Sequence, residues 1–148
     1  MAAVASSAMN TYDVTVENVI GAVTALGAAG PFTVVIDRPV GAGGGGLGFS
    51  GGQLLHVAVA GCISNDLFRE ADKRGISLRH VAVRVTGDFA GSPAVSTGIG
   101  YEVDVEGDAP REELEELVRH VDAIAEIPNS LRLGTRVELT ATRIDRAG

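Results

Sequence analysis

Cys62 is the residue best suited to covalent chemistry, because it is the single cysteine of the 148-residue chain and a thiolate is a strong nucleophile. A lone cysteine excludes an intrachain disulfide and a cysteine-based zinc cluster. The three histidines, His56, His80 and His120, do not have the spacing of a metal-ligand set. The sequence therefore predicts no metal and no cofactor, and it makes Cys62 the first candidate for a catalytic residue.

The position of Cys62 gives its thiol little help in ionising. A free thiol has a pKa of about 8.5, so only a small fraction is thiolate at neutral pH. Cys62 lies about three turns into a helix predicted to begin at Ser50, beyond the reach of the helix dipole, and Asp66 follows one turn later. Activation of the thiol would require a nearby cation. The alternative is that Cys62 is an inert, small hydrophobic residue.

Gln53 and Arg38 are two polar residues that precede Cys62 in the sequence. Gln53 follows Ser50 at the spacing of a capping box, in which each side chain bonds the backbone amide of the other residue. It is also a neutral hydrogen-bond donor that can orient a bound oxygen atom. Arg38 comes directly after an apolar run over 31–37, so it either faces a site or ends a strand in solvent.

A glycine-rich segment over 41–46 matches the Gly-x-Gly-x-x-Gly pattern of dinucleotide-binding loops. A dinucleotide site needs this turn to open directly into a helix of a parallel βαβ unit. Here several residues separate the pattern from the predicted helix, and the strands that follow are predicted to be antiparallel. We interpret the segment as a flexible loop at the rim of a pocket around Cys62.

The elements that must position these residues follow from the hydrophobic pattern. Residues 12–19 and 31–37 predict strands, joined by the glycine- and alanine-rich stretch 21–30. The capping box predicts a helix over 50–74, which Gly75 ends. The first half of this helix is apolar on every side and is expected to be buried, whereas the second half is largely charged and is expected to emerge into solvent.

The second half of the chain predicts a hairpin, a helix and a strand. Residues 81–86 and 99–106 alternate between apolar and polar types and are expected to pair. A second helix is predicted over 108–126, and Pro128 is expected to end it. A last alternating strand is predicted over 136–144. This order of elements indicates an α+β fold, because there is no regular βαβ alternation.

The composition limits the partners and the location of the protein. Twelve basic and 19 acidic residues give a net charge of −7 and a pI near 4.8, which argues against nucleic-acid binding. No apolar run reaches the roughly 18 residues of a membrane span, and the N-terminus lacks the pattern of a signal peptide. We expect a cytoplasmic protein with a single domain over 1–148 and a flexible N-terminus over 1–11.

Several of these segments together resemble the OsmC/Ohr family of thiol-dependent organic hydroperoxide reductases. The similarity starts with the glycine-rich loop and the sequence GGQLLHVAVAGC over 51–62, followed by a glycine-ended helix and a Val-x-Val-x-Val strand. The segment over 127–132, with the sequence IPNSLR, resembles the family's Cys-Pro-x-Ser-like segment after the second helix. The resemblance covers about 31–144. It implies an interwoven α+β homodimer with long helices at its centre and two reaction sites at the subunit interface.

The resemblance also implies an activity, although the chain departs from the family pattern. The second, resolving cysteine is absent from 125–127, Gln53 or Gly52 stands where the family has a glutamate, and Arg38 corresponds only loosely to the family arginine. The implied function is reduction of a small organic hydroperoxide by Cys62 with Arg38 and Gln53, recycled by an external thiol reductant. The alternative is a noncatalytic binding module that holds a small apolar ligand at the dimer interface.

Overall fold

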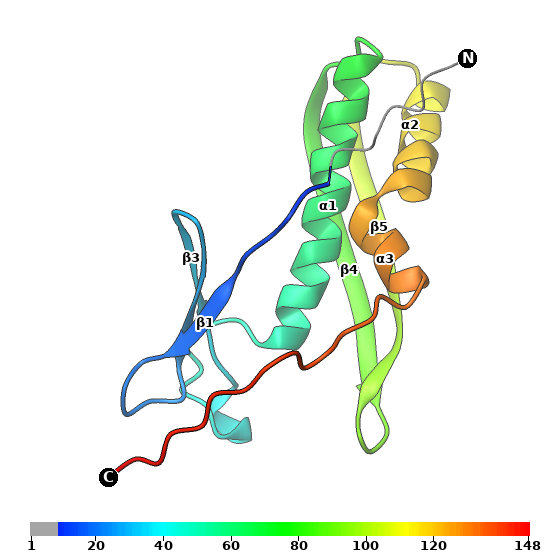
Figure 1. Cartoon of the computed structure of the whole chain (residues 1–148). Coiled ribbons are helices and arrows are strands. Elements are labelled where there is room, and N and C mark those ends of the chain that lie inside the picture. Colours follow the sequence, from blue (N-terminus) through cyan, green and yellow to red (C-terminus); the bar gives the residue numbers. More distant parts are fainter. Residues whose placement is uncertain (1–8) are drawn as a thin grey trace, which may run out of the picture. The chain divides into compact units, whose positions relative to one another are not determined.

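The computed structural model describes residues 9–148, which form an α+β structure with antiparallel sheets. The chain divides into two compact units, Met1–Leu55 and His56–Gly148, which we call the N-terminal and C-terminal units. The predicted flexible N-terminus lies largely outside the described residues. In chain order (Figure 1), the elements are β1 (Thr15–Asn18), β2 (Ala25–Ala29), β3 (Phe32–Ile36), the short 3₁₀ helix η1 (Val40–Ala42), α1 (Gly51–Lys73), β4 (Leu78–Ala90), β5 (Val95–Gly107), α2 (Arg111–Ile124) and α3 (Glu126–Arg132).

The N-terminal unit contains a three-stranded antiparallel sheet in the order β1-β2-β3. Its central strand β2 lies within the stretch 21–30 that was expected only to join two strands, so this expectation is wrong. Alanine and glycine disfavour strands, so the composition of β2 does not predict one. A Cβ atom at Gly27 would lie 2.9 Å from the Cδ1 atom of Ile36 on the neighbouring strand. The Ile36 side chain therefore occupies the space beside Gly27.

The glycine-rich loop after β3 is organised by Asp37, a buried residue whose side chain was not singled out from the sequence. The Asp37 carboxylate accepts hydrogen bonds from the backbone amides of Arg38, Gly45 and Leu47, and from the hydroxyl of Thr24 at 2.9 Å. These bonds lower the pKa of Asp37, against the opposing effect of burial. The loop therefore differs from the flexible segment that its glycine content predicted, because one carboxylate fixes its backbone.

Helix α1 begins and ends as the sequence predicted. The backbone amide of Gln53 donates to the Ser50 hydroxyl at 3.3 Å, and the backbone amide of Ser50 donates to the Gln53 side-chain oxygen at 2.9 Å. This reciprocal pair is the predicted capping box. At the other end, Gly75 adopts a φ of 68°, which terminates the helix at little steric cost.

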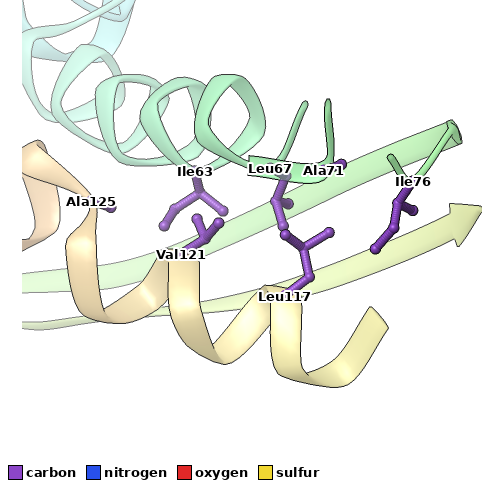
Figure 2. Packing of buried hydrophobic residues seen from close by; sticks show 7 residues of the cluster. All are labelled: Ile63, Leu67, Ala71, Ile76, Leu117, Val121 and Ala125. Carbon is purple, nitrogen blue, oxygen red and sulfur yellow. The ribbon is translucent and has the colours of Figure 1, made fainter. Parts of the chain in front are cut away.

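The burial of α1 agrees with the expectation only in part. In the apolar first half, Ile63 is buried as expected, but Val57 is 51% exposed. In the charged second half, Leu67 is fully buried and the acidic residues Asp66 and Glu70 are buried with it. The reason is that the second half of α1 packs against α2 within the C-terminal unit (Figure 2). The charged residues of this half are therefore partly enclosed, and the apolar first half is left with exposed surface in the single chain.

The C-terminal unit is built on the predicted hairpin, which is longer than expected because β4 and β5 have 13 residues each. Helices α1 and α2 lie on the same side of this hairpin (Figure 1). The side chains of the hairpin that pack against the helical core are half-buried and alternate with exposed ones. On the other face, polar side chains stand opposite each other across the strands, in the pairs Arg84–Glu102 and His80–Glu106.

The second predicted helix is interrupted. It ends at Ile124, Ala125 is extended with φ −63° and ψ 125°, and α3 then begins. Pro128 does not end a helix as expected; it lies in the first turn of α3, where a missing amide hydrogen costs nothing.

The strand predicted over 136–144 is not formed in the single chain. Its apolar side chains are almost fully exposed, with Val137 at 92% and Leu139 at 84%. No other strand of the described residues pairs with this segment, so its backbone lacks the hydrogen bonds that a strand requires.

Candidate functional site

Cys62 is half-buried on α1 and packs against the hydrophobic core of the C-terminal unit. Asp66, one turn further along, was expected to oppose ionisation of the thiol. In the structure the Asp66 carboxylate is buried and forms an ion pair with Arg69 at 2.7 Å. Its charge is therefore partly offset by a neighbouring cation. The core residues are Ile63, Leu67, Ala71, Ile76, Leu117, Val121 and Ala125 (Figure 2).

Glu70 is a second buried carboxylate of α1, and it connects this helix to α2. Its side chain accepts from Lys73 at 2.8 Å and from Arg69 at 3.0 Å, and it lies 3.2 Å from the Nε2 atom of His120 on α2. The hydrogen bond from Lys73, followed by that from Arg69, lowers the pKa of Glu70 to about 2. The sequence pattern indicated only a solvated charged face here, because the burial depends on the packing of α2.

Arg38 and Gln53 both belong to the N-terminal unit, whereas Cys62 belongs to the C-terminal unit. Arg38 follows β3 and lines a cavity of about 540 Å³, which Val23 and Ser50 also line. Gln53 is exposed and occupied by the capping box. The structure thus brings Arg38 close to the start of α1, and the joint action of Arg38 and Gln53 with Cys62 stays a prediction.

A polar network that sequence reasoning missed links β5, α2 and α3 in the C-terminal unit. The hydroxyl of Tyr101 donates to the carboxylate of Asp122, which also accepts from Arg132 at 2.6 Å. Burial, together with the Asp122 carboxylate, raises the pKa of Tyr101 to about 12, and the hydrogen bonds from Tyr101 and Arg132 lower the pKa of Asp122. The three residues are 10 or more positions apart, so only the fold brings them together.

The described part of the chain contains no group of three or more histidine, cysteine, aspartate or glutamate residues that could hold a metal ion. Within the same range, no helix is both long and apolar enough to span a bilayer.

Comparison with known proteins places the chain in a family. Residues 43–140 match the model of the family described as OsmC-like protein. This match covers more than half of the sequence, and the chain belongs to the OsmC-like family. No match was found among curated proteins.

Solved structures share the fold at low sequence identity. An OsmC-like protein from Mycoplasma pneumoniae has 20% identity and a TM-score of 0.72, with 85% of this chain and 89% of that chain covered. An organic hydroperoxide resistance protein OsmC from Legionella pneumophila has 20% identity and a TM-score of 0.59, with 85% and 92% covered. An organic hydroperoxide resistance protein from Elizabethkingia anophelis, with thiocyanate bound, has 17% identity and a TM-score of 0.60, with 88% and 93% covered.

Proposed function

We propose that the protein is a thiol-dependent organic hydroperoxide reductase whose single redox centre is Cys62. The observation that carries this proposal is the half-buried thiol of Cys62 among the apolar side chains of α1. The fold that holds it is shared with organic hydroperoxide resistance proteins. Apolar surroundings suit the organic group of a hydroperoxide, and the partial exposure of Cys62 suits attack by an external reductant.

The reaction has two stages. The Cys62 thiolate attacks the terminal peroxide oxygen, the O–O bond breaks, and the organic product leaves as an alcohol after taking up a proton, so that Cys62 becomes a sulfenic acid. An external thiol then attacks the sulfur and releases water, and a second thiol displaces Cys62 from the mixed disulfide. The chain has no other cysteine, so the electrons for each cycle come from two molecules of external thiol or from one dithiol.

Arg38 and Gln53 are the proposed assistants of Cys62. The guanidinium of Arg38 provides the positive charge that favours a thiolate, and it lines a cavity together with the residue that caps α1. The side-chain amide of Gln53 can donate a hydrogen bond to a peroxide oxygen while its oxygen atom keeps the capping bond to Ser50.

We further propose that the working form is a cytoplasmic homodimer, in which each chain is one OsmC-like domain over 1–148. Two features support association: the exposed apolar side chains of the first half of α1 and the unpaired alternating segment 136–144. Both expose apolar surface to solvent, and a second copy of the chain can cover such surface. A free catalytic thiol also suits a reducing compartment.

The test is to incubate the protein with cumene hydroperoxide and to measure its intact mass and its free thiol content. We expect the addition of one oxygen atom and the loss of the single titratable thiol, both reversed by a small thiol reductant. Cys62→Ser is the matched control, because it removes the only thiol and should show neither change. If Cys62 stays reduced, the peroxidase proposal fails and the noncatalytic binding module, which holds a small apolar ligand, is the remaining function.

A further inference from the structure

The junction between α2 and α3 is held by side chains that replace missing helical hydrogen bonds. Because Ala125 leaves the helical conformation, the carbonyls of Asp122 and Ala123 at the end of α2 lose their usual amide partners. Arg132 donates to the Asp122 carbonyl and Asn129 donates to the Ala123 carbonyl, both at 2.9 Å. Arg132 also donates to the side-chain oxygen of Asn129 at 2.9 Å. Two residues of α3 thus cap the C-terminus of α2.

The carboxylate of Asp122 connects this junction to the sheet. It accepts from Tyr101 of β5 and from Arg132 of α3, while its own residue belongs to α2. Tyr101 is half-buried and also packs against the hydrophobic core. Three elements are therefore fixed at one carboxylate, and the direction in which α3 leaves α2 is set there.

The junction lies at one end of the hydrophobic core that Cys62 also contacts (Figure 2). Ala125, the residue at the break, is fully buried, and Pro128 just after it is buried as well. In Figure 2, Ala125 lies at the end of the core where Ile63 packs, away from Ile76. Ile63 follows Cys62 directly in α1, and the Cys62 side chain contacts the same core. Movement of the junction would therefore open the core beside the thiol.

We propose that Tyr101, Asp122 and Arg132 are positioning residues that hold the α2–α3 junction against the core and thereby set the reactivity of the Cys62 thiol. The importance of this control for turnover rests on the proposed peroxidase function, but the effect on the thiol itself does not. The network acts on the thiol through the buried residue Ala125.

The experiment measures the alkylation rate of Cys62 by iodoacetamide as a function of pH in the folded full-length protein. Tyr101→Phe removes one oxygen atom, Arg132→Gln removes the charge, and Arg132→Lys restores a cation. The control is Arg111→Gln, which breaks the ion pair with Glu115 at the opposite end of α2. We expect Tyr101→Phe and Arg132→Gln to change the alkylation rate by roughly three- to thirtyfold and to shift the midpoint of its pH profile. Arg132→Lys should restore part of the rate, and the control should leave both quantities unchanged.

Circular dichroism identifies the variants that keep the native helix content, and only these are compared. Unchanged rates and midpoints in folded Tyr101→Phe and Arg132→Gln would overturn the proposal. If Arg132→Gln does not fold, Tyr101→Phe decides alone, because it alters a single hydroxyl. Alkylation needs no peroxide, so a protein whose Cys62 resists hydroperoxide but whose alkylation depends on this network would refute the peroxidase and support the positioning role.

Discussion

Glu70 shows how a single buried carboxylate can make the stability of the molecule depend on pH. Its pKa in the folded chain is lowered from an ordinary value of 4.5 to about 2. Above pH 4.5 the stabilising interactions are fully present. Between pH 4.5 and 2 the unfolded chain takes up a proton that the folded chain does not, so the free energy of unfolding falls as the pH falls.

We predict that Glu70→Gln lowers the free energy of unfolding at pH 7 by about 1–3 kcal/mol, because it removes charged hydrogen bonds with Lys73 and Arg69. The variant should also lose part of the decline in stability below pH 4.5. Urea denaturation at pH 7, 4 and 3 measures both effects. Glu115→Gln, which alters an exposed ion pair with Arg111, serves as the control. An acid dependence identical to that of the unaltered protein would contradict this account of Glu70.

Asp37 has a comparable role in the N-terminal unit, where it holds the glycine-rich loop. We predict that Asp37→Ala leaves the backbone amides of Gly45 and Leu47 without their acceptor and destabilises the protein. Hydrogen exchange should accelerate at these two amides first. Asp13→Ala removes an exposed carboxylate and should leave the loop unchanged. Equal exchange rates in the two variants would mean that the loop is held by other contacts.

At the scale of elements, the break between α2 and α3 decides where a second cysteine could meet Cys62. The alignment of the family's Cys-Pro segment left Ile127 and Ala125 as alternatives. Ala125 is fully buried in the core that Cys62 contacts, whereas Ile127 is 36% exposed. A disulfide requires Cα atoms about 4.4–6.8 Å apart. The structure therefore favours Ala125 over Ile127.

We predict that Ala125→Cys forms an intrachain disulfide with Cys62 after hydroperoxide treatment and that Ile127→Cys forms much less. Nonreducing peptide mapping identifies the linked peptides, and each variant untreated with hydroperoxide is the control. If Ile127→Cys forms the disulfide instead, α3 lies differently against Cys62. If neither does while Cys62 oxidises, the junction does not approach the thiol.

The elements that the sequence predicts well are those with local signals. Ser50 and Gln53 mark the start of α1, Gly75 marks its end, and alternation identifies the β4–β5 hairpin. Strand β2 carries no such signal, because alanine and glycine have a low strand propensity. The break at Ala125 has no local sequence signal either, because the side chains that cap the end of α2 belong to α3.

The candidate site could be predicted only in part, for the same physical reason. Cys62 could be named as a candidate because it is the single cysteine of the sequence. Its place on the long helix could be predicted from the hydrophobic pattern. Asp37, Asp122 and Tyr101 could not be identified, because their hydrogen bonds join positions distant in sequence. The burial of Glu70 also depends on another helix, and a pattern read along α1 alone assigns it to a solvated face.

At the scale of the whole molecule, association depends on the apolar surface that a single chain leaves exposed. We predict a stable dimer at micromolar concentration in analytical ultracentrifugation. The double change Val137→Asp and Leu139→Asp should shift the equilibrium toward monomer, because it places two charges on one face of the unpaired segment. Thr140→Asp and Thr142→Asp add the same charge on the opposite face and serve as the control. A stable monomer of the unaltered protein would contradict the proposed assembly.

The outer face of the β4–β5 hairpin carries exposed charged side chains, including Arg84 across from Glu102. Charges distributed in this way stay hydrated, and covering them with another protein would cost desolvation energy. This face is therefore the natural place to attach the molecule to a solid support or a fluorescent reporter. A label at the exposed Thr86 would leave the helical side and the strand edges free for a partner, so that assembly and thiol chemistry could be followed on one immobilised sample.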